Sequence, residues 1–507
     1  MKSTIKNVVK VSLNDSEFVG ALELDGSNTS LTCWQLEGKR SNAYGIKPLE
    51  IKGFALDSFE NITLLDVLNL GESTHSKKTD NGQLKSLVSH RFFPHYVVTG
   101  PTSFNHNDEI FDSIQFEING LSNIFTNNKL LQYVNFADHL SIQQLISTDR
   151  KSRNEILNIV DSNDAKPIDL GENPLVFIHT GLNNICKLQT SHGLISLDYL
   201  TSGSQGLHNH SVDCRIACTI KFNSKKNFRI AYNNIWPVLN LFTLIAGHKL
   251  FADKIDLIVE RSTGGSSNYN VYSSMYVQED VETSYHQGLI NPNRNLDEFS
   301  KLLPNWLDRT ENWMHARNQF FNSFSSNMYS SDRLVTTANM FDIIPDEEYC
   351  NNNQLPDDLI AAREKCKNIF KSLNHSPERD SILGALGRIG KLTLKNKVKE
   401  RAAVMSNITK LELEDFDFVI NQCIDCRNYF VHGSVKRFDY FAQSDLVHFF
   451  IDTLEFIFGI SELAEAGWDF NRWKNDYRGF HPYSSYLSSY IMNLNKLKTS
   501  VEQYKLK

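Results

Sequence analysis

The stretch DFDFVINQCIDCRNYFVHG, residues 415–433, repeats apolar side chains at intervals of three and four residues before it turns polar. This spacing predicts a helix that buries one face. The residues on that face are Phe416, Val419, Ile420 and Cys423. Gly433 follows directly and suits the left-handed position that ends many helices. The stretch therefore predicts a core helix whose last turns carry polar groups.

Those polar groups are Arg427, Asn428 and His432. Asn428 and His432 are four residues apart and share a helix face, and Arg427 precedes Asn428. A guanidinium at the end of a buried stripe costs free energy unless an anion, such as a phosphate or a carboxylate, neutralises it. The structural alternatives are a chance spacing and a contact between His432 and the helix dipole.

The same three side chains supply what RNA cleavage without a metal requires. The ribose 2′-OH must lose a proton, the 5′-oxygen must gain one, and the charge on the phosphate must be stabilised. A histidine can move protons near neutral pH, an arginine offers forked donors to phosphate oxygens, and an amide can orient either group. A single histidine would have to serve as both general acid and general base, so we expect another protomer to supply a second copy of the site.

The sequence around this helix predicts an all-α bundle from about residue 296. Residues 296–324 have helical periodicity, with a break expected at Pro304. Residues 356–373 form another amphipathic helix, and residues 444–467 a third that ends at Gly467. The apolar stripe of the segment 356–373 consists of Leu359, Ile360, Cys366, Ile369, Phe370 and Leu373.

The first 260 or so residues predict β structure, because short runs such as EFVGALELDG alternate and end at turn residues. Within this part, residues 139–166 are helical or loop, the apolar run 233–251 is a buried helix, and residues 261–270 are a polar loop or linker. The fold class is α+β, with a sandwich-like or barrel-like β region before the bundle. The expected domains are 1–260, a linker with connecting helices over 261–345, and 346–507.

Composition narrows the class of protein. The chain has 507 residues, 41% of them hydrophobic and 22% charged, with a formal net charge of -7. This composition is that of a globular protein and argues against a general polyanion binder, although a local basic pocket stays open. We expect no signal peptide and no membrane span. Eight scattered cysteines predict a reduced, cytoplasmic protein.

The segment RNYFVHG, residues 427–433, resembles the signature of the HEPN superfamily, whose ribonucleases carry an arginine and a histidine separated by four to six residues. In the N-terminal half, EFVGALELDG, NITLLDVLNLG and FFPHYVVTGPTSF resemble, in the same order, the N-terminal domain of ApeA-like bacterial anti-phage proteins. Together the two resemblances cover most of the chain.

The resemblance implies an abortive-infection effector that cleaves RNA, with tRNA as the expected target and a phage-derived trigger sensed by the N-terminal region. It implies a homodimer or higher homo-oligomer that forms through the HEPN domain, with a composite site that needs no metal or other cofactor. Its products would carry a 2′,3′-cyclic phosphate and a 5′-OH. Arg427 and His432 would be catalytic and Asn428 would support them. The alternative is a HEPN module that binds RNA, a nucleotide or a partner without cutting.

Basic and aromatic residues near this motif are candidates for substrate contacts. Lys436 and Arg437 follow the motif and are candidate ligands of the substrate phosphate. The basic segment 391–401 is either a solvated helix face or a grip on the RNA backbone. Tyr429 and Phe438 could stack a base, although core packing is the favoured interpretation for each.

Other signals favour structure over chemistry. Cys423 and Cys426 form a lone C-x2-C for which packing is favoured over zinc or redox chemistry. The cluster from His208 to Cys218, which includes His210 and Cys214, favours a strand core over zinc. The segment LGALGRIGKLT, residues 383–393, lacks the glycine and the hydroxyl residue of a phosphate-binding loop and is rejected as one.

Overall fold

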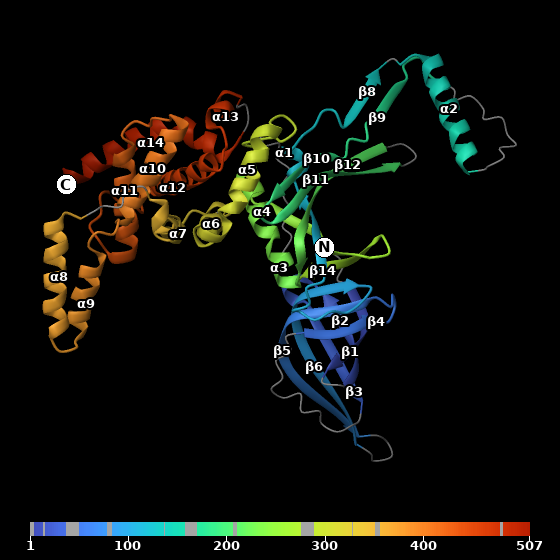
Figure 1. Cartoon of the computed structure of the whole chain (residues 1–507), viewed down its shortest axis with the longest axis horizontal. Helices are drawn as coiled ribbons and strands as arrows, with labels where there is room; N and C mark the ends of the chain where they lie inside the picture. The colour runs from blue at the N-terminus through green and yellow to red at the C-terminus, as the bar shows by residue number, and fades with distance from the viewer. Residues whose placement is uncertain are drawn as a thin grey trace.

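The computed structural model describes residues 5–13, 16–36, 50–78, 84–135, 137–157, 170–205, 210–274, 288–326, 328–349, 355–476 and 480–506. Its fold is α+β, as the sequence predicts: a β-rich N-terminal region precedes a region of helices (Figure 1). Within these residues, no helix is both long enough and apolar enough to cross a membrane.

Six antiparallel strands at the start of the chain close into a barrel. The strand order is β6-β3-β2-β1-β4-β5, and β5 pairs back onto β6. Alternate side chains point inward, as on β1, where Val9 and Val11 are buried. Gly53 is required at one crossing, because a Cβ atom there would lie 2.2 Å from the Lys10 carbonyl oxygen. The strands are β1 (Ile5–Leu13), β2 (Ser16–Leu24), β3 (Ser30–Leu36), β4 (Glu50–Ala55), β5 (Asn61–Lys78) and β6 (Leu84–Gly100).

Six further strands extend the same sheet beyond the barrel in the order β10-β11-β12-β7-β13-β14, with β14 paired to β6. They are β7 (Phe111–Asn119), β10 (Asn184–Thr190), β11 (Gly193–Gln205), β12 (His210–Lys226), β13 (Phe251–Glu260) and β14 (Ser266–Ser273). A separate ribbon, β8 (Leu131–Asn135) and β9 (Leu175–His179), leads to α2 (His139–Leu157) at the far end of Figure 1.

The β region extends further along the chain than predicted, because β14 follows residue 260. The polar segment 261–270 is a loop only in its first half, where Gly264 and Gly265 have positive φ angles. Its second half pairs with β13. The polar residues of β14 alternate with Tyr269 and Val271, which are buried, so one face of the strand is exposed. The polar residues of this exposed face led to the prediction of a loop or linker.

Short helices connect the sheet to the helical region through a shared core. α1 (Leu121–Ile124), α3 (Phe228–Asn233) and α4 (Ile235–Ala246) pack on the sheet, and α4 is the buried helix that the apolar run predicts. Trp306 donates a hydrogen bond to the Pro237 carbonyl at 3.0 Å. One apolar cluster therefore runs without interruption from the sheet into the bundle.

The bundle packs around α12 (Ser444–Glu465), which is buried along nearly its whole length. The helices packed on it are α6 (Thr310–Phe324), α7 (Ser331–Asp342), α10 (Leu394–Thr409), α11 (Phe416–His432) and α14 (Pro482–Lys505). The others are α5 (Leu296–Asp308), α8 (Asp357–Ser372), α9 (Pro377–Arg388) and α13 (Phe470–Asp476).

The break expected at Pro304 is wrong. Pro304 lies inside α5, and the chain turns only at Arg309. A proline inside a helix costs about 3 kcal/mol. Here Leu303, Trp306 and Leu307 are at most 1% exposed. Their burial offsets that cost and holds the helix together across the proline.

Helix α8 forms as predicted, but its apolar stripe is not buried in the chain. No residue of α8 or α9 is buried. The rejected phosphate loop falls largely within α9 and follows no strand, which confirms the rejection.

Candidate functional site

The candidate site lies at the C-terminal end of α11, where the helix passes from core to surface. Val419, Ile420 and Cys423 are fully buried, whereas His432 is exposed. The helix ends at Gly433, which has φ 66° and donates its N–H to the Tyr429 carbonyl at 2.9 Å. The buried stripe and the glycine end of this helix are confirmed.

The three motif side chains meet around the guanidinium of Arg427. Its Nη1 donates to Oδ1 of Asn428 at 3.1 Å and lies 3.4 Å from Nε2 of His432. Because an arginine remains protonated, Nε2 of the imidazole acts as the acceptor in this contact. Arg427 therefore lies between the amide and the imidazole.

A fourth residue, Asn339, completes the cluster from α7. Its Oδ1 accepts a hydrogen bond of 2.8 Å from Nη2 of Arg427. Asn339 is not among the residues predicted from the sequence, and it lies 88 positions before Arg427. The only local signal is a polar, poorly helix-forming residue beside the buried Ala338 and Met340.

The electrostatics of Arg427 differ from those of five other buried or half-buried arginines in the helical region. Within the described residues Arg427 has no carboxylate partner, and its Nε is buried without a hydrogen bond. Five other arginines of the helical region each pair with a glutamate at 2.6–3.0 Å: Arg309 and Arg317 with Glu462, Arg333 with Glu455, Arg401 with Glu465, and Arg472 with Glu298. Arg427 is thus a half-buried cation held by neutral groups.

Lys436 and Arg437 lie on the loop after α11 in different surroundings. The Lys436 ammonium lies 5.0 Å from the ring centroid of Tyr429 and 5.1 Å from that of Phe441. Arg437 donates from Nε to Asp425 at 2.9 Å. Lys436 keeps its charge available beside the motif, whereas the charge of Arg437 is shared with a carboxylate.

The basic segment before α11 is not a solvated face. Lys397 is 8% and Arg401 0% exposed. Lys395 pairs with Asp425 at 3.1 Å and Lys399 with Asp417 at 2.9 Å, both on α11. These cations join α10 to its neighbours, so the interpretation of the segment as a solvated face is wrong for these four residues, whereas its contact with an RNA backbone stays a prediction.

The aromatic residues near the motif divide by exposure. Phe438 is 1% exposed and packs against Tyr440, so it belongs to the core. Phe441 is 68% exposed and packs edge-on against Phe430. Phe441, which the sequence analysis did not single out, is therefore the aromatic ring with a free face beside Lys436.

The cysteines pack as the favoured interpretation predicts. Cys423 and Cys426 are fully buried, and burial raises the pKa of both thiols above the ordinary value. In the second cluster Cys218 is buried, and His208 lies outside the described residues. No group of three or more His, Cys, Asp or Glu side chains in the described ranges could hold a metal ion.

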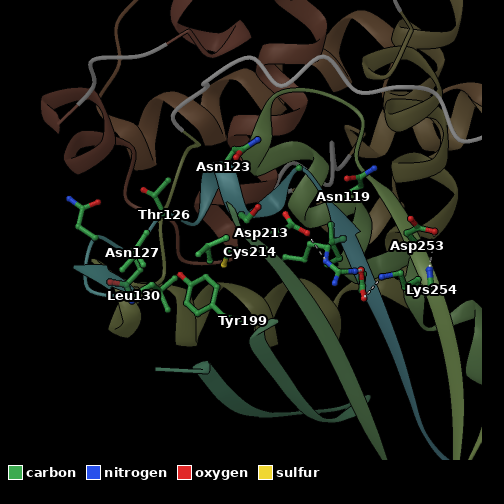
Figure 2. Close-up of a pocket in the computed structure, with 18 residues that line it drawn as sticks. Asn119, Asn123, Thr126, Asn127, Leu130, Tyr199, Asp213, Cys214, Asp253 and Lys254 are labelled. Carbon is green, nitrogen blue, oxygen red and sulfur yellow. Dashed lines mark hydrogen bonds and ion pairs between the residues drawn. The ribbon is translucent and has the colours of Figure 1, made fainter. Parts of the chain in front are cut away.

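The N-terminal region contains a cavity of about 670 Å³ where β7 and β12 meet the loop after α1 (Figure 2). Its basic side chains are paired: Glu117 accepts from Arg215 at 2.6 Å and from Lys254 at 3.1 Å. Several amides line the rest, including Asn119 and Asn123. The cavity has the size of a site for a small ligand or a short peptide segment.

Comparisons with known proteins agree with this two-part architecture. A family model described as ApeA N-terminal domain 1 matches residues 8–306, and one described as Apea-like HEPN matches residues 335–471. The second match contains Asn339, Arg427 and His432. No curated protein and no solved structure matches the chain.

HEPN domains are generally ribonucleases that bind RNA and commonly dimerise, and their combination with an ApeA N-terminal domain is the architecture of an anti-phage defence effector. The chain belongs to the ApeA family and carries an ApeA-like HEPN domain after its N-terminal β-rich region.

Proposed function

We propose that this chain is a metal-independent endoribonuclease whose active site contains Arg427, Asn428 and His432. The observation that carries the proposal is the half-buried guanidinium of Arg427, which has amide and imidazole partners and no carboxylate within the described residues. A substrate phosphate would supply the missing anion.

The chemistry follows from these contacts. A phosphate oxygen that takes over the Nη1 donor of Arg427 releases Nε2 of His432. The imidazole then accepts the proton of the ribose 2′-OH, the 2′-oxygen attacks phosphorus, and the bond from phosphorus to the 5′-oxygen breaks. The leaving 5′-oxygen receives a proton, which leaves a 2′,3′-cyclic phosphate and a 5′-OH. Arg427 stabilises the charge on the phosphate throughout.

One imidazole cannot hold both protonation states at once. We assign the second proton transfer to His432 of a second copy of the chain, so that two motifs form one composite site. Asn428 orients Arg427 by its 3.1 Å hydrogen bond. Lys436 contacts a flanking phosphate and Phe441 offers its exposed ring to a splayed base. Arg437 contributes less to binding of the substrate phosphate, because its Nε already donates a hydrogen bond to Asp425.

We further propose that the substrate is tRNA and that cleavage arrests the growth of an infected cell. In this scheme the N-terminal region responds to a phage-derived trigger, and the cavity beside Glu117 and Arg215 is where that response would begin. The core shared by the sheet and the bundle offers a physical route from one region to the other.

The alternative is a HEPN module that binds RNA or a partner without cutting. Overexpression in a bacterial host distinguishes the two. We expect growth arrest from the wild-type chain, and normal growth from Arg427→Ala and from His432→Ala expressed to the same level. Arrest that survives both substitutions would refute cleavage at this site.

A further inference from the structure

The ribbon of β8 and β9 begins at the cavity of the N-terminal region (Figure 1). The two strands are antiparallel, and within the described residues no third strand pairs with either of them. Leu131, the first residue of β8, lines the cavity, as does Leu130 before it. Among the described residues that line the cavity, none belongs to β9. The cavity therefore borders β8.

The backbone of β8 presents hydrogen-bonding groups on the side away from β9. The Leu130 carbonyl accepts a hydrogen bond from the Thr180 N–H at 3.0 Å, so this carbonyl points toward β9. Residues of an antiparallel pair alternate in direction, so Leu131 and Tyr133 point their N–H and C=O groups away from β9. These groups form an open strand edge that starts at the cavity. Such an edge binds an extended peptide backbone.

One face of the ribbon is apolar and exposed. Tyr133 is paired with Phe177, and this pair lies on the same face as Leu131 and Leu175, because side chains alternate along each strand. These four side chains are 41–65% exposed. A two-stranded ribbon is marginally stable in water. A third strand on β8 would place alternate side chains against this face.

The cavity offers neutral hydrogen-bonding groups in addition to its ion pairs (Figure 2). The side chains of Asn119, Asn123 and Thr126 line it and have no hydrogen-bond partner within the described residues. Amides and hydroxyls can each donate and accept a hydrogen bond. They therefore match the N–H and C=O groups that alternate along a peptide backbone.

The charges of the cavity argue against a polyanion. The lining holds three carboxylates and two cations: Glu117, Asp213, Asp253, Arg215 and Lys254. Both cations already pair with Glu117, at 2.6 and 3.1 Å. Within the part of the chain that the structure describes, Asp253 has no ion-pair partner. A nucleic acid would meet excess negative charge here, whereas a neutral or basic peptide would not.

The backbone of β13 is irregular at these charges. The register of β13 against β7 shifts between Asp253 and Asp256, and Lys254 within this bulge has φ 43°. A left-handed conformation costs free energy in a lysine. A bulge turns a side chain out of the regular alternation, and bulges recur beside binding sites. Here the Lys254 ammonium reaches Glu117 in the cavity, which is a sign of a built site that does not depend on the ribbon.

We propose that β8 and the cavity bind an extended segment of another protein. The segment adds a third strand to the ribbon at the free edge of β8 and places one end in the cavity. It carries apolar residues at alternate positions beside Tyr133 and neutral or basic residues in the cavity. This inference rests on the proposed function, in which the N-terminal region responds to a phage-derived trigger, and it assigns that trigger to the class of proteins.

A library of random peptides displayed on filamentous phage and selected on the full-length chain provides the probe. We expect selected peptides to alternate apolar residues in one half and to lack Asp and Glu in the other half. Fluorescence anisotropy with a labelled synthetic copy of a selected peptide measures its dissociation constant. A library that yields no peptide bound through the β8 edge and the cavity would overturn the proposal.

Proline at Tyr133 tests the strand edge. Tyr133→Pro removes an N–H that points away from β9, and proline is tolerated at such edge positions. We expect the peptide to bind about 10-fold more weakly than to Tyr133→Ala, which also lacks the ring but keeps the N–H. Circular dichroism checks that each variant is folded.

The cross-strand partner of Tyr133 supplies the matched control. Phe177 points its N–H to the opposite edge of the ribbon, so Phe177→Pro and Phe177→Ala should bind the peptide equally. Equal binding by the two Tyr133 variants would overturn strand addition to β8. A loss specific to proline at both positions would do the same, because it would reflect damage to the ribbon.

Asn123→Trp tests the cavity by filling it. We expect the peptide to bind about 10-fold more weakly or worse, whereas Met492→Trp, at a position 67% exposed on α14, should bind as the wild type does. Unchanged binding by Asn123→Trp would remove the cavity from the site. A labelled single-stranded RNA of random sequence is the second probe. Loss of RNA binding in Asn123→Trp alone would assign the cavity to nucleic acid and overturn the proposal.

RNA cleavage separates this inference from the proposed function. Cleavage by a wild-type chain that binds no selected peptide refutes the peptide site alone. Peptide binding that responds to Tyr133→Pro and Asn123→Trp in a chain that never cuts RNA refutes the proposed nuclease and leaves the peptide site standing.

Discussion

Arg333 and Arg427 are two arginines of one bundle with opposite surroundings. Arg333 on α7 is 9% exposed and places Nη2 3.0 Å from both carboxylate oxygens of Glu455. Arg427 on α11 is half-buried and bonds to the amide oxygens of Asn339 and Asn428. The same helix α7 carries Arg333 and Asn339, six residues apart. Arg333 therefore has its anion inside the chain, whereas Arg427 has none within the described residues, and in the proposed function the substrate phosphate supplies it.

The largest expected effect is on catalysis at the unpaired arginine. Arg427→Met keeps the length of the side chain and removes the phosphate donors. We expect RNA cleavage to fall by about 10³-fold or more, in the range known for loss of a charge-stabilising donor. Stability should change by less than about 1 kcal/mol, because the amides of Asn339 and Asn428 can bond to water instead. Single-turnover cleavage and urea denaturation of the same preparations measure the two quantities.

The same substitution at Arg333, which pairs with Glu455, should lower the stability of the protein more than its cleavage activity. Arg333→Met leaves the Glu455 carboxylate buried without its partner, at a cost of about 3–5 kcal/mol. Burial raises the pKa of Glu455 to about 7 even with Arg333 beside it, so denaturation is best measured at pH 8, where the wild-type pair is ionised. A stability loss at Arg427 as large as that at Arg333 would remove the distinction between the two arginines.

A substitution at Asn339 can give Arg427 a carboxylate partner of the kind that Arg333 already has. Asn339→Asp offers Arg427 a carboxylate of nearly the same shape. We expect cleavage to fall about 10- to 100-fold because that carboxylate competes with the substrate phosphate, while the melting temperature does not fall. Asn339→Ala is the control: it loosens Arg427 without adding a charge, and should weaken cleavage through misplacement alone. If the aspartate variant cleaves RNA as well as the wild type, the missing anion is not what defines this site.

The smallest expected effect concerns the stability of the protein at acid pH and arises at Glu465, the partner of Arg401 and Arg309. Burial alone would raise the pKa of Glu465, but Arg401 and Arg309 outweigh it and hold the pKa below its ordinary value. A carboxylate with a lowered folded pKa stabilises the protein above its unfolded pKa, and this contribution is lost as the pH falls through the folded value. We expect the stability advantage of the wild type over Glu465→Gln to shrink, by on the order of 1 kcal/mol, as the pH falls from 7 to below about 4. An advantage that is constant over this range would show that Glu465 does not titrate with folding.

Local patterns account for the parts of this molecule that the sequence predicts. The helix α11 and its end at Gly433 depend on backbone contacts within four residues, and Arg427 lies within five residues of both Asn428 and His432. Asn339 could not be found in this way, because its place beside Arg427 depends on how α7 packs on α11.

The stripe of α8 shows a second limit. Its periodicity correctly predicts a helix, yet no residue of α8 is buried among the described residues, so periodicity alone does not decide burial. At Pro304 the local rule predicted a break, and the burial of Leu303 and Trp306 overrode it. At Pro304 the deciding contacts are distant in sequence, as the hydrogen bond from Trp306 to the Pro237 carbonyl shows.

The measurement that tests the central claim most directly is cleavage of total tRNA by purified full-length chain in EDTA, beside His432→Ala. We expect fragments that end in a 2′,3′-cyclic phosphate and begin with a 5′-OH from the wild type, and none above background from the variant. Cleavage of the same kind by both proteins would contradict it, because the proton transfer would then belong to residues other than His432.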